Sequence, residues 1–147
     1  GLIMVLGGTN DWAQSTPLGA VTSSNTAEFY GAYNQMCQKL TARYPGARIV
    51  LMATTYGELP GRVTDLSWST AYTNTQGLTT RDYAEAVRVM GKRWGFPVAD
   101  TDMSGWNTGN LATYITYDGG YLHPNAVGGA RIGEVVIGKL RSLTPSV

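Results

Sequence analysis

Three short, continuous apolar runs lie along the sequence, separated by longer segments with helical periodicity. The first run is residues 2–6 (LIMVL), and similar runs follow at residues 49–52 and 96–99. A strand with apolar residues on both faces needs cover on both faces, which a parallel sheet between helices provides. Pro97 places the third run near a sheet edge. We therefore expect a three-layer α/β/α domain built on a parallel sheet.

The segments between the runs predict helices. Asn25 and Glu28 form a capping-box pattern, and a helix is expected from there to Pro45-Gly46. A second helix is predicted over residues 79–94, where Gly95 is a suitable stop, and a closing helix over residues 125–140. Residues 9–24 and 54–77 are rich in Thr, Ser and Gly and are expected to form loops.

Composition removes several classes of function. A length of 147 residues suits one domain, and the net charge of +1 with scattered basic residues gives no reason to expect nucleic acid as a partner. No run approaches the roughly 18 apolar residues of a membrane span, so no membrane partner is expected. Cys37 is the only cysteine, which excludes an intramolecular disulfide and a Cys-based zinc site. Neither a metal nor a cofactor is predicted.

The residues most suited to chemistry follow the first run. Ligand sites of open α/β sheets lie at the carboxyl ends of the strands. There, Gly8 allows a sharp turn and a close approach of substrate, and Asn10 offers a side-chain amide. Thr9 and Trp12 flank that amide and are expected to contact the substrate. The alternative is an Asx turn, in which Asn10 only hydrogen-bonds the nearby backbone.

His123 is the only histidine, in the segment Leu122-His123-Pro124-Asn125 at the entrance to the last predicted helix. A loop position next to a rigid proline favours a held imidazole, although a surface histidine without a role is the alternative. A single His without a Cys partner argues against zinc.

Taken together, a GxND motif after a parallel strand and an HPN motif before the C-terminal helix resemble the SGNH (GDSL-type) serine hydrolase family. The resemblance follows the order of the family over nearly the whole chain. It implies a flavodoxin-like α/β/α fold, an oxyanion-hole role for Asn10 and a general-base role for His123. It also implies a Ser-His-(Asp) acyl-enzyme mechanism acting on an ester, either a small acyl ester or an acylated glycan.

The chain departs from the family pattern in two ways. The GDS block with the nucleophilic Ser is absent, so we expect residues 1–147 to be an incomplete domain in which Gly1 is internal to a longer polypeptide. The missing segment, or a second chain, would supply the Ser and two strands, and without them residues 2–6 would form an exposed apolar edge. The family's acid position is Gly120 here, so Asp118 is the expected triad acid.

Several alternatives remain open at this stage. Asp100 or Asp102 could replace Asp118, or a Ser–His dyad could operate. Asp11 is interpreted as structural, and Ser104 as a turn residue. A different class of function is a non-catalytic carbohydrate-binding or receptor-recognition module on a degenerate scaffold. A nucleotide-binding domain is disfavoured because no GxGxxG or P-loop motif follows a strand.

Overall fold

The computed structural model describes residues 1–55, 73–107, 109–117 and 121–143, with residues 117, 121 and 122 described by their backbone alone. Within these ranges a parallel sheet has the order β1-β2-β3, formed by β1 (Leu2–Leu6), β2 (Arg48–Met52) and β3 (Val98–Ala99). The register pairs Leu2 with Arg48 and Leu51 with Val98. All three predicted strands are confirmed, and β3 lies at an edge as its proline suggested.

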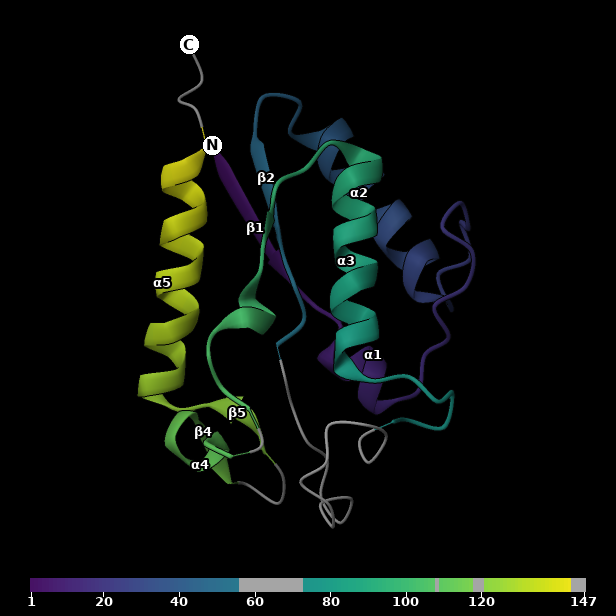
Figure 1. The fold of residues 1–147 in the computed structure, drawn as a ribbon. Coiled ribbons are helices and arrows are strands. Elements are labelled where there is room, and N and C mark those ends of the chain that lie inside the picture. The colour runs from purple at the N-terminus through teal and green to yellow at the C-terminus, as the bar shows by residue number, and fades with distance from the viewer. Residues whose placement is uncertain (56–72, 108, 118–120, 144–147) are drawn as a thin grey trace.

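Helices cover both faces of this sheet, which confirms the three-layer α/β/α arrangement. Helices α2 (Phe29–Arg43) and α3 (Thr80–Trp94) lie on one face and α5 (Ala126–Ser142) on the other (Figure 1). The first face holds the larger core, in which Phe29, Tyr83 and Leu51 are fully or almost fully buried. The second face packs Val50 and its neighbours against α5.

The boundaries of α3 follow the sequence signals closely. Thr79 and Asp82 form a reciprocal capping box, because each side chain accepts a hydrogen bond from the backbone of the other residue. Gly95 ends the helix in a left-handed conformation at φ 69°. In contrast, the N-cap of α2 is Glu28, three residues after the expected cap Asn25. Asn25 instead forms a local turn, in which its side chain accepts from the Ala27 N–H and its carbonyl from the Glu28 N–H.

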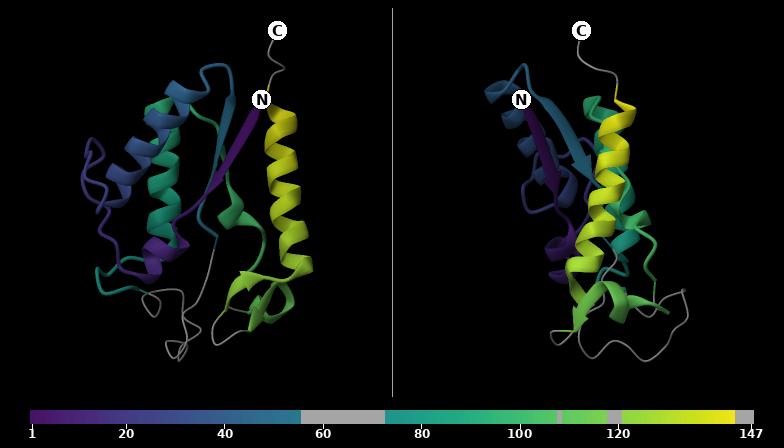
Figure 2. Two further views of the ribbon diagram at one scale, coloured as in Figure 1. Left: turned by 180° about the vertical axis from the view of Figure 1, so that it is seen from behind. Right: turned by 90° about the vertical axis from the view of Figure 1, so that its left-hand side faces the viewer.

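Two further differences concern segments that were expected to be loops. Residues Thr9–Ala13 form a short helix, α1, directly after β1. The segment before α5 contains a short helix, α4 (Leu111–Tyr114), and an antiparallel pair, β4 (Ile115–Tyr117) and β5 (Tyr121–Pro124). A 3-10 turn, η1 (Thr101–Met103), follows β3. Both views of Figure 2 show α1 and the β4–β5 hairpin beyond the carboxyl ends of the parallel strands.

β1 lies at an edge of the sheet and, among the described strands, pairs only with β2. Its side chains Ile3 and Val5 pack into the core below α2 and α3. On the other face, Leu2, Met4 and Leu6 are 48%, 49% and 49% exposed. An apolar row of this kind on an edge strand is open to contact with a further segment.

Candidate active site

A cavity of about 380 Å³ lies at the carboxyl end of the sheet. Its walls come from the end of β1, the start of α1, the third residue after β2, the end of β5 and one residue of α5. They comprise Leu6, Gly7, Gly8, Thr9, Asn10, Asp11, Thr55, His123, Pro124 and Ile132. Four of the predicted site residues, Gly8, Thr9, Asn10 and His123, therefore line one cavity.

The position of Asn10 follows from the turn after β1. Gly8 has φ 112°, a left-handed backbone that residues with a side chain rarely adopt, and it caps α1. The Trp12 N–H donates to the Gly8 carbonyl at 2.9 Å and closes the first turn of that helix. Asn10 is exposed in this first turn and lines the cavity at the carboxyl edge of the sheet.

His123 reaches the same cavity from a strand rather than from the loop that was expected. It lies on β5 opposite Thr116 of β4, and its side chain is exposed. One residue beyond Pro124, Asn125 caps α5 by accepting hydrogen bonds from the Val127 and Gly128 N–H groups. The Asn125 amide also donates to the Thr113 carbonyl, which fixes the start of α5 against α4. The segment that carries the imidazole is thus held by pairing with β4 and by the contacts of Asn125.

Trp12 requires a correction. We expected it to contact the substrate, but its side chain is 0% exposed and packs in the core below α2 and α3. The indole Nε1 donates to the Leu78 carbonyl at 3.1 Å, so Trp12 joins α1 to the start of α3. Residues two positions apart lie on nearly opposite sides of an α-helix. Trp12 of α1 therefore faces the core, whereas Asn10 faces the cavity. Trp12 is therefore a core residue.

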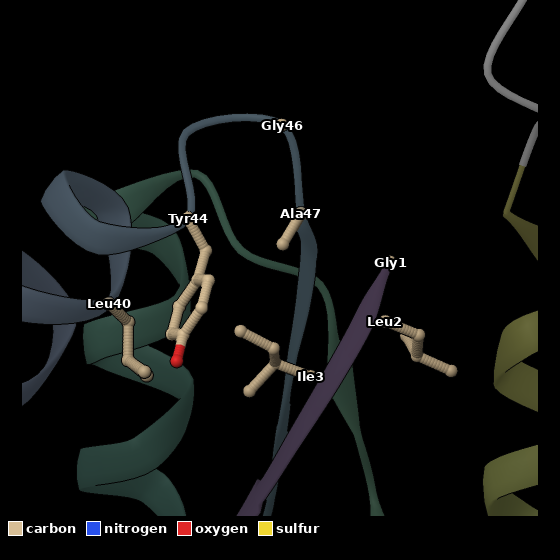
Figure 3. A pocket seen from close by; sticks show the side chains of 7 residues that line it. All are labelled: Gly1, Leu2, Ile3, Leu40, Tyr44, Gly46 and Ala47. Atoms are coloured by element: carbon tan, nitrogen blue, oxygen red, sulfur yellow. The ribbon is translucent and has the colours of Figure 1, made fainter.

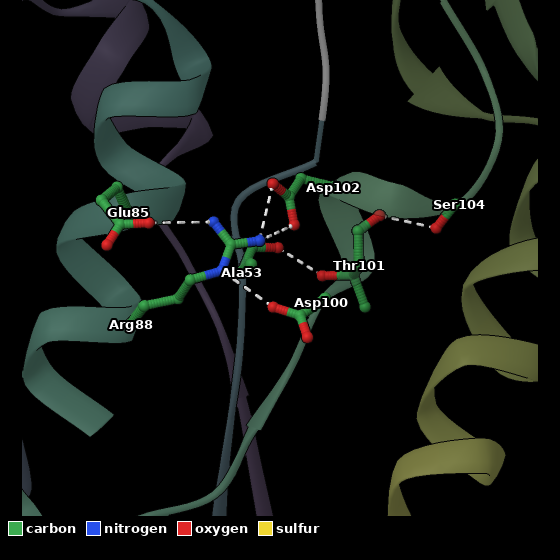
Figure 4. Close-up of polar contacts among 7 residues, drawn as sticks. All are labelled: Ala53, Glu85, Arg88, Asp100, Thr101, Asp102 and Ser104. Atoms are coloured by element: carbon green, nitrogen blue, oxygen red, sulfur yellow. Dashed lines mark hydrogen bonds and ion pairs between the residues drawn. The ribbon is translucent and has the colours of Figure 1, made fainter. Parts of the chain in front are cut away.

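The carboxylates divide into different groups. Asp118 lies outside the described residues. Asp11, interpreted as structural, lines the cavity beside Asn10, and burial raises the pKa of its carboxyl. Asp100 and Asp102 do not line it. They bind Arg88 of α3 instead, whose Nε lies 2.8 Å from Asp100 Oδ1 and whose Nη2 lies 2.6 Å from Asp102 Oδ1 (Figure 4).

The Arg88 ion pairs anchor η1 to α3 rather than serving the cavity. Within η1, the Thr101 hydroxyl donates to the Ala53 carbonyl, and the Ser104 hydroxyl donates to the Thr101 carbonyl at 2.6 Å (Figure 4). Ser104 is buried in this network, which agrees with its interpretation as a turn residue. A substrate would have no access to its hydroxyl.

Thr55 is a cavity residue that the motifs did not identify. The signal was its position, because it lies three residues after the end of β2 and the carboxyl ends of parallel strands share one edge. A second cavity, of about 480 Å³, lies at the opposite end of β1 (Figure 3). Leu2, Ile3, Leu40 and Tyr44 give it mostly apolar walls, and among its described lining residues there is no His, Asn or acidic side chain. It offers no group for acyl transfer.

The described helices include none that is both long and apolar enough to cross a membrane. Within the same described residues, no three His, Cys, Asp or Glu side chains gather in a way that could hold a metal ion.

Comparison with solved structures agrees with this fold. A Lactobacillus plantarum protein has 26% identity and a TM-score of 0.82, and the match covers 97% of this chain and 67% of that one. A possible lipase from Chitinophaga pinensis has 22% identity and a TM-score of 0.70, with coverage of 99% and 74%. An α/β hydrolase enzyme from the metagenome of Lake Arreo, Spain, has 18% identity and a TM-score of 0.57, with coverage of 97% and 61%. This chain thus spans about two thirds of the length of these proteins.

No curated protein matches the chain significantly. The family model for GDSL-like lipases and acylhydrolases, however, matches residues 1–131, a span that includes both Asn10 and His123. With the parallel sheet and its covering helices, this match shows that the chain belongs to the GDSL-like lipase/acylhydrolase family, whose name indicates a hydrolase.

Proposed function

We propose that this chain carries the oxyanion donor and the general base of a serine esterase. The observation that supports this most strongly is that Asn10 and His123, from opposite ends of the sequence, line one cavity. Acyl transfer needs a hydrogen-bond donor and a base within reach of the same carbonyl group. In the proposed reaction, the Asn10 amide donates to the oxygen of the tetrahedral intermediate and the His123 imidazole takes the proton of the nucleophile.

The nucleophile in this proposal is a Ser from outside residues 1–147. It attacks the ester carbonyl, the intermediate collapses, and the alcohol leaves with the proton that His123 held. Water then repeats the sequence and releases the acid. None of the described residues that line the cavity is a serine. Asp118 would orient the imidazole through its second nitrogen.

The half-exposed row of Leu2, Met4 and Leu6 also supports this proposal, because burial of these apolar side chains by a further strand would stabilise the fold. A strand placed along the free edge of β1 would pair its backbone groups and bury part of that row. The carboxyl end of such a strand would lie next to Gly8 and Asn10, because neighbouring parallel strands end at the same edge of a sheet. A nucleophile following that strand would enter the cavity.

We further propose a small, uncharged acyl ester as the substrate. Leu6, Pro124 and Ile132 give the cavity apolar walls, and about 380 Å³ accommodates a short acyl group with its alcohol. Trp12 and Trp106 are buried, so these two aromatic side chains provide no sugar-stacking surface. An acylated glycan therefore has less support than a small ester.

The test is p-nitrophenyl acetate hydrolysis by the complete protein, with its upstream segment present. Asn10→Ala should lower kcat by about 10²–10³-fold, and His123→Ala should reduce turnover at least as much. Asn25→Ala is the control, because it removes the same amide from an exposed turn before α2. Undiminished turnover in both active-site variants would remove Asn10 and His123 from the mechanism. An absence of turnover in the unmodified complete protein would favour the non-catalytic binding module instead.

A fluorophosphonate probe tests where the nucleophile lies. Peptide mass spectrometry should find the adduct on a Ser that precedes Gly1 in the complete protein, and residues 1–147 alone should remain unlabelled. An adduct on Ser104 or on any other serine of these 147 residues would contradict an external nucleophile.

A further inference from the structure

The side-chain hydroxyl of Thr54 joins the ends of two strands directly below the cavity. Thr54 follows β2 and is 0% exposed, and its Oγ1 donates to the Gly7 carbonyl at 2.8 Å. Gly7 is the first residue after β1 and precedes the turn that leads to Asn10. The hydrogen bond therefore ties that turn to the central strand of the described sheet.

The same hydroxyl lies against Gly8. A Cβ atom built on Gly8 would be 2.1 Å from Thr54 Oγ1, and the left-handed backbone at φ 112° already restricts this position to glycine. The turn is thus held by a hydrogen bond at Gly7 and by close contact at Gly8. Because α1 begins at the next residue, both contacts fix where its first turn, with Asn10, stands relative to the sheet.

We propose that Thr54 is a positioning residue for the oxyanion donor Asn10 and acts through the Gly7-Gly8 turn. This inference rests on the proposed function, since it requires that Asn10 stabilises a transition state. An oxyanion donor contributes only when it meets the developing charge in the correct geometry, and a displacement of about 1 Å can cost about 10²-fold in rate. The contribution of Thr54 should therefore appear in kcat rather than in KM.

Three variants of the complete enzyme separate positioning from general stabilisation. Thr54→Val keeps the shape of the side chain but removes the donor, and Thr54→Ser keeps the donor. Thr101→Val is the matched control, because Thr101 is also a buried threonine after a strand whose hydroxyl donates to a backbone carbonyl, that of Ala53, without touching the turn. We expect Thr54→Val to lower kcat by about 10–100-fold with little change in KM. Thr54→Ser and Thr101→Val should stay within about threefold of the unmodified enzyme.

Combination with Asn10→Ala gives the readout that a merely structural role would not move. If Thr54 acts through Asn10, Thr54→Val should cost less than about threefold once the amide is gone, because the two changes remove one interaction. Fully additive losses, equal losses in Thr54→Val and Thr101→Val, or no loss in Thr54→Val would each overturn the inference.

Hydrogen–deuterium exchange provides a measurement that does not depend on catalysis. The amides of α1, including the Trp12 N–H that donates to the Gly8 carbonyl, should exchange faster in Thr54→Val and at the normal rate in Thr54→Ser and Thr101→Val. Full activity of Asn10→Ala with faster exchange in Thr54→Val would mean that the proposed function is wrong while Thr54 still positions the turn. Unchanged exchange in Thr54→Val would refute the positioning itself.

Discussion

The packing of α5 against α4 predicts how substitution of two adjacent glycines, Gly128 and Gly129, changes the stability of the fold. A Cβ atom on Gly128 would lie 2.0 Å from the Tyr114 carbonyl oxygen and 3.2 Å from Pro124 Cβ. A Cβ atom on Gly129 would meet nothing within 4 Å among the described residues. The same substitution at neighbouring positions of one helix should therefore change stability in opposite directions.

The magnitudes follow from two terms. Replacing Gly by Ala inside a helix stabilises it by about 0.5–1 kcal/mol. At Gly128 the opposing atom is backbone, so it cannot rotate away, and α5 must shift by about 1.3 Å to reach an ordinary C···O contact of about 3.3 Å. Overpacking of this kind costs about 1–3 kcal/mol. Gly128→Ala should thus lose about 1–2 kcal/mol net, whereas Gly129→Ala should gain the helix term alone.

Thermal unfolding followed by circular dichroism measures both changes. At about 3–4 °C per kcal/mol for a chain of this size, Tm should fall by about 3–8 °C in Gly128→Ala and rise by about 2–4 °C in Gly129→Ala. Because α5 begins three residues after His123, Gly128→Ala should also lower kcat of the complete enzyme while Gly129→Ala should not. Equal increases of Tm in both variants would refute the packing of Gly128 on Tyr114.

Three further predictions concern the charged and titratable residues. Burial raises the pKa of the Cys37 thiol to about 11, so a disulfide reagent at pH 8 should label it only at the rate of unfolding, and rapid native labelling would contradict its burial. Since the pKa of this thiol is lower in the unfolded chain, at about 9, the free energy of unfolding should also fall as pH rises from about 9 to 11. Burial raises the pKa of Asp11, so its ionisation opposes folding; Asp11→Asn should raise the urea midpoint at pH 7 and lose this advantage below pH 3.8. Arg88→Met should lower the free energy of unfolding by about 2–3 kcal/mol, because it leaves the mostly buried Asp102 without its partner; an unchanged urea midpoint would exclude this.

Features with strong local signals could be predicted from the sequence. The three apolar runs became β1, β2 and β3, and Thr79 and Gly95 marked the ends of α3 because capping depends on residues within one turn. Asn10 could be placed at the carboxyl edge of the sheet because it follows β1, whereas the order of the family's motifs assigned His123 to the same site.

The remaining features depend on contacts between distant segments. The β4–β5 pair joins two separate segments, and its short strands show no clear alternation of apolar and polar residues. Helix α1 has only five residues, so its existence rests on the Gly8 turn rather than on helical propensity. The burial of Trp12 follows from that helix and therefore could not be predicted either. The start of α2 was predicted too early because an Asn side chain can either cap a helix or stabilise a turn, and Asn25 forms a turn.

Under the proposed function, the edge strand β1 would make this chain comparable to one half of a split enzyme. If the nucleophile-bearing strand is supplied as a separate polypeptide, its addition along Leu2–Leu6 is a bimolecular event, and turnover should rise with its concentration until the edge is saturated. A covalent connection would replace that concentration with an effective one in the millimolar range. If the two halves were fused to two interacting proteins, binding between those proteins would bring the halves together and restore ester hydrolysis. Ester hydrolysis would then report the interaction.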